Sequence, residues 1–146
     1  MEPSSKYKKG KNSDPSSIVP IFIVDDDLCF LGALGFRLKQ NLMYKVYCYT
    51  NAEECMKNMQ LNPSIIILDY LLNTEKSDAI NGLDILKKIK NRKTKTKVIM
   101  LSGQKTLEVA ISALKSGAYT YLIKDINAIA SVLRIVNTLC LDKLKA

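Results

Sequence analysis

The sequence contains no histidine and no tryptophan, and its four cysteines form no Cys-x-x-Cys pair. The lack of histidine excludes histidine-ligated zinc, Ser-His-Asp catalysis and phosphorylation of this chain on histidine. Each cysteine has apolar neighbours, as small core side chains do, which favours a reducing compartment over a disulfide framework. The cysteines are Cys29, Cys48, Cys55 and Cys140.

Long hydrophobic runs are also missing. No stretch of the 146 residues approaches the length of a membrane span, and the polar N-terminus lacks the apolar core of a secretory signal. We therefore expect a cytoplasmic protein without membrane contact. The length suits one domain, so the sequence predicts a flexible basic leader at residues 1–17 and a single domain at residues 18–146.

Acidic residues are fewer than basic ones, and the formal net charge is +8. Much of the excess comes from a run of cations at a predicted helix end and the loop after it, where cations suit the helix dipole. No aromatic residues are interleaved with this run. A solvated helix end is therefore favoured over a polyanion-binding patch, and we expect no direct nucleic-acid binding. The cations are Lys87, Lys88, Lys90, Arg92, Lys93, Lys95 and Lys97.

Short apolar runs alternate along the chain with segments whose apolar residues recur at every third and fourth position. The runs predict strands, and the recurring segments predict helices. Strict alternation of five such pairs implies a parallel sheet covered by helices on both faces. The predicted strands are residues 19–24, 44–49, 64–68, 97–101 and 119–123.

Each predicted helix has an apolar stripe that we expect to face the core. Two local signals mark helix ends: residues 50–53 have the pattern of a capping box that begins at Thr50, and Gly117 is suited to stop the fourth helix. The stripe of the fourth helix consists of Leu107, Ala110, Ile111 and Leu114.

Charged residues stand where the apolar runs stop. Asp25, Asp26 and Asp27 follow the first run, Asp69 follows the third, and Lys124 follows the fifth. The carboxyl ends of parallel strands share one edge of a sheet, so these charges can converge there. Crowded carboxylates disfavour one another's charged form unless a cation lies among them, and Mg²⁺ prefers oxygen ligands. The pattern predicts a metal site with a reactive aspartate.

Five short motifs occur in order on the predicted strand ends and loops, namely Val24-Asp25-Asp26-Asp27, Ile67-Leu68-Asp69, Asn81-Gly82, Leu101-Ser102-Gly103 and the segment from Gly117 to Lys124. Together they resemble the receiver domain of bacterial two-component response regulators, over residues 18 to about 144. The resemblance implies an α/β, flavodoxin-like, doubly wound fold: a five-stranded parallel sheet in the order 2-1-3-4-5 with five helices.

The resemblance also implies roles for individual residues. Asp69 would be the phosphoacceptor, taking a phosphoryl group from a sensor histidine kinase or a phosphotransfer protein. A carboxylate can act as this nucleophile without a general base, because it is already ionised. Asp25 and Asp26 would hold Mg²⁺ together with Asp69 and the backbone carbonyl of Leu71, and Mn²⁺ or Ca²⁺ can substitute.

The remaining implied roles concern charge and switching. Lys124 would bind the phosphoryl oxygens, and Ser102 would donate its hydroxyl to them once the group is attached. Tyr121 would then move inward, and the surface of the fourth helix, fifth strand and fifth helix would change its affinity for an output domain, a partner protein or a second copy of the chain. Such a protein catalyses only its own phosphorylation and dephosphorylation, so it is not an enzyme in the usual sense.

Some of these residues also have plain structural explanations. Asp25 and Asp26 suit the acidic first turn of a helix, and Asp27 fits the residue that starts this helix better than it fits a metal ligand. Tyr121 suits a half-buried strand position without any switch. The coincidence of these residues with Asp69 and Lys124 at strand ends favours the metal site.

Two other functions stay open as alternatives. The first is a magnesium-dependent phosphatase of the haloacid dehalogenase type with Asp25 as its nucleophile. That pattern expects Thr or Val where Cys29 stands, and it expects a later acidic pair that is missing. The second is an interaction module of the same fold that is never phosphorylated, which the complete acidic set disfavours.

Three features depart from the family pattern. The loop at residues 73–80 is longer than usual, and Asp125 follows Lys124 where a proline is common, so we predict a trans peptide bond or a local rearrangement there. Leu71 and Gln104 occupy positions that modulate phosphoryl hydrolysis in this family. The segment 99–125 is similar to receivers that head enhancer-binding transcription activators, and we expect a stand-alone or an excised receiver.

Overall fold

The structure is a computed structural model that describes residues 14–72, 81–103 and 105–145. The loop at residues 73–80, Gln104 and residues 1–13 of the predicted leader lie outside the described residues. Within the rest of the leader, Pro15–Ser17 form a largely exposed 3-10 turn, and the Asp14 side chain accepts a hydrogen bond from Ser16 N. The chain then enters the sheet directly.

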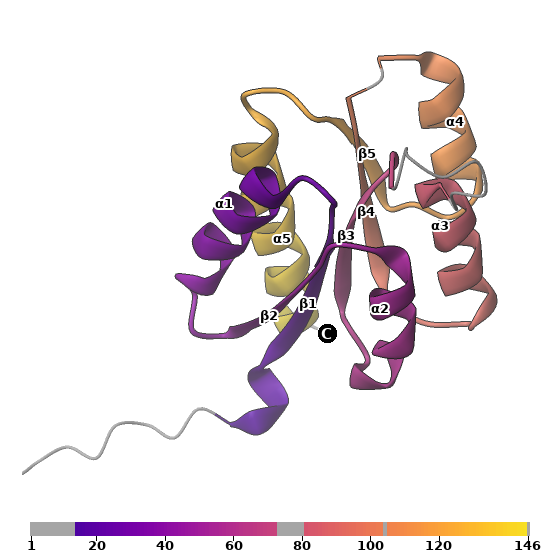
Figure 1. Cartoon of the computed structure of the whole chain (residues 1–146). Helices are drawn as coiled ribbons and strands as arrows, with labels where there is room; N and C mark the ends of the chain where they lie inside the picture. The colour runs from indigo at the N-terminus through magenta and orange to yellow at the C-terminus, as the bar shows by residue number, and fades with distance from the viewer. Residues whose placement is uncertain (1–13, 73–80, 104, 146) are drawn as a thin grey trace, which may run out of the picture.

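The core of the fold is one parallel sheet (Figure 1). All four pairs of neighbouring strands are parallel, and the order is β2-β1-β3-β4-β5, so the predicted fold class and strand order are confirmed. Every predicted strand is present, with its ends shifted by one residue at most. The strands are β1 (Val19–Val24), β2 (Tyr44–Tyr49), β3 (Ile65–Asp69), β4 (Lys97–Ser102) and β5 (Thr120–Ile123).

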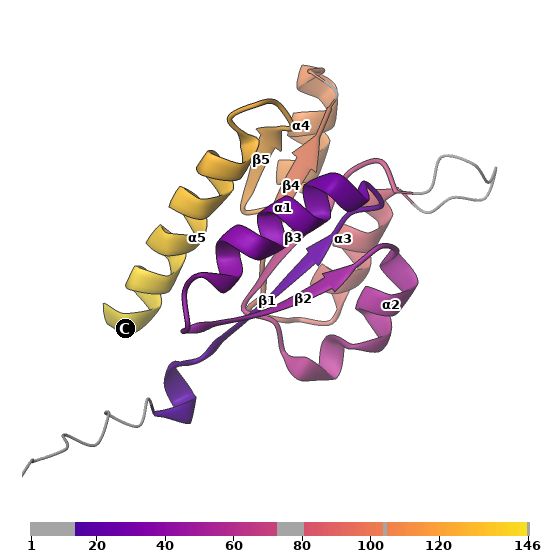
Figure 2. The same ribbon diagram turned by 60° about the vertical axis from the view of Figure 1, so that its left-hand side comes forward.

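Helices cover both faces of this sheet (Figures 1 and 2). The first and fifth helices pack on one face, and the second, third and fourth pack on the other. This arrangement is the usual solution for a parallel sheet, because its crossover helices must cover both apolar faces. The helices are α1 (Leu28–Lys39), α2 (Ala52–Lys57), α3 (Gly82–Asn91), α4 (Leu107–Lys115) and α5 (Ala128–Lys145), and a short 3-10 turn (Met59–Leu61) follows α2.

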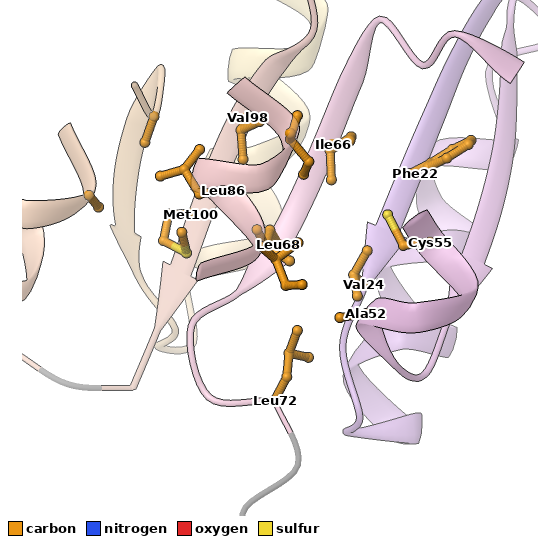
Figure 3. Packing of buried hydrophobic residues seen from close by; sticks show 14 of the residues in the cluster. Phe22, Val24, Ala52, Cys55, Ile66, Leu68, Leu72, Leu86, Val98 and Met100 are labelled. Atoms are coloured by element: carbon orange, nitrogen blue, oxygen red, sulfur yellow. The ribbon is translucent and has the colours of Figure 1, made fainter. Parts of the chain in front are cut away.

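Alternate residues of the central strands face opposite layers. Phe22 and Leu68 are fully buried on the side of α2 and α3, in the cluster that also contains Cys55 of α2, near Phe22, and Leu86 of α3 (Figure 3). Ile23 and Ile67 are buried on the side of α1 and α5. Burial on both faces explains why β1 and β3 are continuous apolar runs without polar alternation.

The helix ends follow the sequence signals with one correction. Asn51 caps α2, accepting a hydrogen bond from Glu54 N, whereas the sequence pattern placed Thr50 at this position. Asn and Thr are both good capping residues, so the pattern could not choose between neighbours. Gly117 follows the end of α4 with φ of 103°, a conformation that favours glycine, as predicted.

The predicted core stripe of α4 is wrong. Leu107, Ile111 and Leu114 are 74%, 41% and 50% exposed, and the buried residue of this helix is Ala113. The helix lies beside the edge of the sheet, where it packs against β5 and α3. The small residue Ala113 faces these elements, so the larger apolar side chains of α4 are exposed to solvent.

A matched pair of substitutions tests this assignment of inner and outer faces. We expect Leu86→Ala to lower the free energy of unfolding by about 3 kcal/mol, because the fully buried side chain leaves a cavity. Leu107→Ala should change it by less than about 0.5 kcal/mol, because its side chain is mostly exposed. Urea denaturation measures both values. A loss of similar size in the two variants would contradict the outward orientation of α4.

Candidate functional site

The carboxyl edge of the sheet brings together the charged residues that follow the strands. Asp69 ends β3, Ser102 ends β4, and Asp25 and Lys124 follow β1 and β5 directly. Backbone hydrogen bonds continue the ladder to these positions: Asp25 N donates to Tyr49 O at 3.0 Å, and Lys124 N donates to Ser102 O at 2.8 Å. The site residues therefore stand on the rigid ends of the sheet.

Three carboxylates form the centre of the site. Asp25, Asp26 and Asp69 each offer an oxygen within 4.8 Å of the others. Asp25 and Asp69 are buried at 1% and 5% exposure, whereas Asp26 is exposed. Like charges at this separation repel strongly when water is largely excluded, so the cluster needs a compensating cation.

Lys124 supplies one compensating charge from the protein itself. Its Nζ lies 2.7 Å from Asp25 Oδ2, 3.8 Å from Asp69 Oδ2 and 3.9 Å from Asp27 Oδ2. The same Nζ lies 4.6 Å from the centre of the Phe30 ring. The sequence predicted no role for Phe30 at the site, and the signal that could have placed it here is its position in the first turn of α1, close to the strand ends.

One lysine does not balance the site. Burial, followed by the charge of Asp25, raises the pKa of Asp69 to about 7, even though Lys124 opposes the shift. Burial alone would lower the pKa of Lys124, but the carboxylates of Asp25, Asp69 and Asp27 outweigh burial and raise it. Asp25 Oδ2 is buried, and the ammonium of Lys124 at 2.7 Å is its charged partner. Buried oxygen ligands with excess negative charge fit a hard divalent cation.

The segments beside Asp69 are tightly fitted to it. Leu71 N donates a hydrogen bond to Asp69 Oδ1 at 3.3 Å. Gly82 N, at the start of α3, donates to Tyr70 O at 2.7 Å. A Cβ on Gly82 would collide with the backbone carbonyl of Asp69, so the motif Asn81-Gly82 allows α3 to begin directly against the acidic site.

Ser102 and Tyr121 lie on neighbouring strands. Ser102 is fully buried at the end of β4 and pairs with Ile123 of β5. Tyr121 is half-buried, pairs with Met100 and packs against the core cluster on the side of α3 and α4. Ser102 thus reaches the edge that carries Asp69, and Tyr121 lies one strand further out.

Asp27 is the N-cap residue at which α1 starts, in agreement with the prediction that it is the helix-starting residue. Its Oδ1 accepts hydrogen bonds from Cys29 N and Phe30 N, which caps the helix. At the other end of the site, the described residues contain no cis peptide bond, so the Lys124–Asp125 bond is trans, as predicted. Asp125 N donates to Ile123 O at 3.0 Å, which makes a tight turn around Lys124.

Comparisons with known proteins agree with this geometry. A family model described as the response regulator receiver domain matches residues 21–136. A putative NtrX-like response regulator of Rickettsia conorii is 32% identical over 130 residues, which cover 88% of this chain and 27% of that protein. The acid tolerance regulatory protein ActR of Rhizobium meliloti is 32% identical over 108 residues, which cover 74% and 53% of the two chains.

The solved structures agree as well. A CheY-like response regulator receiver domain protein from Methanospirillum hungatei superimposes with a TM-score of 0.73 at 25% identity, covering 89% of this chain and 100% of that chain. The chain spans about a quarter of the length of the NtrX-like relatives and about half that of ActR. Among the described helices, none combines the length and hydropathy needed to cross a bilayer.

The raised pKa of Asp69 predicts how stability depends on pH without metal. The unfolded chain releases the Asp69 proton near pH 3.8, whereas the folded state holds it to about pH 7. Raising the pH between these values therefore favours unfolding. With EDTA at about pH 8, we expect Asp69→Asn to be more stable than the wild type, by on the order of 2 kcal/mol.

The measurement is urea denaturation of both proteins at about pH 5 and pH 8, with and without Mg²⁺. The difference should shrink toward pH 5, where the wild-type carboxyl is mostly protonated. Mg²⁺ should reduce it at pH 8 by stabilising the wild type. A variant that is less stable than the wild type in EDTA at pH 8 would contradict the assigned charge crowding.

Proposed function

The chain belongs to the response regulator receiver domain family, and on that premise we propose that Asp69 accepts a phosphoryl group from a sensor histidine kinase or a phosphotransfer protein. The observation that carries the proposal is the setting of Asp69. It is buried at the end of a central strand, within reach of two further carboxylates and 3.8 Å from the ammonium of Lys124. The proposed nucleophile Asp69, the ammonium of Lys124 and the carboxylates that would hold a metal ion thus lie together at the carboxyl edge of the sheet.

Asp25, Asp26, Asp69 and the backbone carbonyl of Leu71 would hold Mg²⁺, with Mn²⁺ or Ca²⁺ as substitutes. The bound ion would neutralise charge on the phosphoryl oxygens. The transfer step itself is carried out by residues of the chain. An Asp69 oxygen forms the new bond to phosphorus as the phosphorus–nitrogen bond to the donor histidine breaks. The ammonium of Lys124 already lies near both Asp25 and Asp69. It therefore needs only a small movement away from these carboxylates to bind the transferred oxygens on Asp69.

Phosphorylation then acts as a switch. Ser102 donates its hydroxyl to the phosphoryl group, and Tyr121 moves inward on the adjacent strand, so the surface of α4, β5 and α5 changes. The outward apolar residues of α4 support a partner surface there: Leu107, Ile111 and Leu114 are exposed. We propose an output domain, a partner protein or a phosphorylation-dependent homodimer as the readout, in the cytoplasm and without direct binding to nucleic acid.

The phosphatase alternative requires Asp25 to be the nucleophile. Asp25 is 1% exposed, its Oδ1 accepts the N–H of Asp27, and its Oδ2 faces Lys124 at 2.7 Å. Lys124 Nζ lies further from Asp69 than from Asp25, so a phosphoryl group has more room beside Asp69. These contacts favour Asp69 as the nucleophile, and we propose that the chain catalyses only its own phosphorylation and dephosphorylation.

Phosphorylation can be tested directly. After incubation with Mg²⁺ and acetyl phosphate, intact-mass measurement should show one added phosphoryl group, which Asp69→Asn abolishes and EDTA suppresses. Asp84→Asn is the matched control, because Asp84 is an exposed carboxylate in the first turn of α3. Labelling that persists in Asp69→Asn would disprove the assignment, and turnover of a generic phosphomonoester without labelling would favour the phosphatase.

The lifetime of the phosphoryl group depends on how water reaches it. Leu71 lies two residues beyond Asp69 with 39% of its surface exposed, and an apolar side chain there obstructs the attacking water. We expect Leu71→Asn to shorten the lifetime several-fold, because its amide can orient that water. Loss of label over time measures it, with Leu71→Ile as an apolar control. Fast decay in the wild type that Leu71→Asn leaves unchanged would refute the role.

A further inference from the structure

A hollow lies at the opposite edge of the sheet from the acidic site. It has a volume of about 850 Å³ and opens between the amino ends of the strands and the last turns of α5. Figure 1 shows the end of α5 at this side, below the sheet, while the acidic edge is above. Such a volume is typical of small-molecule sites. Its apolar wall includes Val19, Met59, Ile65 and Leu139.

Cations crowd around this apolar wall. Asp142 is the one carboxylate in the lining, and none of the five lining cations is within ion-pair distance of a carboxylate among the described residues. Most of these cations come from the loop before β4, whereas one comes from α5, far away in sequence. They are Arg92, Lys93, Lys95, Lys97 and Lys143.

The polar groups of the lining are only partly satisfied: Lys143 Nζ donates to Ser64 Oγ and Thr96 Oγ1 donates to Pro63 O, but one buried hydroxyl has no partner. Burial, followed by the charge of Lys97, lowers the pKa of Lys90, whose Nζ donates to Thr96 O just behind the lining. Thr94 Oγ1, which belongs to the lining, is buried without a hydrogen-bond partner. An anion in the hollow would offset the repulsion between the cations and offer an acceptor to this hydroxyl.

The hollow also offers an aromatic surface. Tyr119 is 46% exposed in the lining, and Lys97 Nζ lies 5.7 Å from the centre of its ring. An aromatic ring beside a group of cations suits a ligand that has both a flat ring and phosphate groups. A nucleic-acid strand would instead need a long basic stripe, and these cations surround a concave site.

We propose that this hollow, the basic hollow, binds a nucleotide. Arg92, Lys93, Lys95, Lys97 and Lys143 contact its phosphates, and its base lies on Tyr119 and the apolar wall. The site is at the other edge of the sheet from Asp69, so a ligand there does not compete with a phosphoryl group for the acidic residues.

The test uses ATP, adenosine and tripolyphosphate as probes, in buffer with EDTA so that no metal bridges the probe to the acidic site. Isothermal titration should show ATP binding at one site, at least tenfold tighter than either fragment. Amide chemical shifts of the wild type should move at Thr94 and Tyr119. Absence of saturable ATP binding at millimolar concentration, or tripolyphosphate binding as tightly as ATP, would overturn the proposal.

Charge variants locate the site. Lys95→Gln with Lys97→Gln should weaken ATP binding tenfold or more, because both lysines line the basic hollow. Lys87→Gln with Lys88→Gln is the matched control: these exposed lysines of α3 belong to the same cationic run but not to the lining, and the change should be under twofold. Equal losses in both pairs, or tighter binding of a single-stranded oligonucleotide than of ATP, would also overturn it.

Discussion

The structure depends on the contact between Lys124 and the carboxylates at the carboxyl edge of the sheet. Asp25, Asp26 and Asp69 are held closer together than free carboxylates would stay, and two of them are buried. The ammonium of Lys124, 2.7 Å from Asp25, is the cation that the chain itself provides. Its charge is insufficient, because burial and then the charge of Asp25 still raise the pKa of Asp69. The site thus favours a further positive charge, which the proposed metal ion would supply.

The rest of the fold keeps these groups in place. Continuous apolar strands buried on both faces end at one edge, and the ladder of hydrogen bonds extends one residue further to Asp25 and Lys124. The start of α3 lies against the carbonyl of Asp69 only because position 82 has no side chain. Asp27 fixes the start of α1, and thereby the place of Phe30 beside Lys124. Rigid positions of this kind suit a transfer reaction that needs alignment more than acid or base catalysis.

Much of this could be predicted from the sequence, for identifiable reasons. The strands were visible because double-sided burial makes them uninterrupted apolar runs, as in β1 and β3, and the site followed because charges stand at their carboxyl ends. The strand order came from the family resemblance. Periodicity failed for α4, because it identifies an apolar stripe but not whether anything covers it, and the sheet ends beside this helix. The contact of Phe30 with Lys124 joins two elements far apart in the chain, so no local pattern contains it.

The basic hollow is a second feature that no local sequence pattern contains, because distant parts of the chain form it. It also suggests why the two edges of the sheet differ in charge. In sequence, the cationic run after α3 looks like a solvated helix end, because Lys143 is nearly fifty residues away. In a parallel α/β fold, helices run opposite to the strands, so their N-termini lie at the carboxyl edge and their C-termini at the amino edge. The positive ends of the helix dipoles thus face the acidic residues, and the negative ends face the cations. This arrangement partly offsets repulsion within each cluster, which allows one sheet to carry an acidic edge and a basic edge at once.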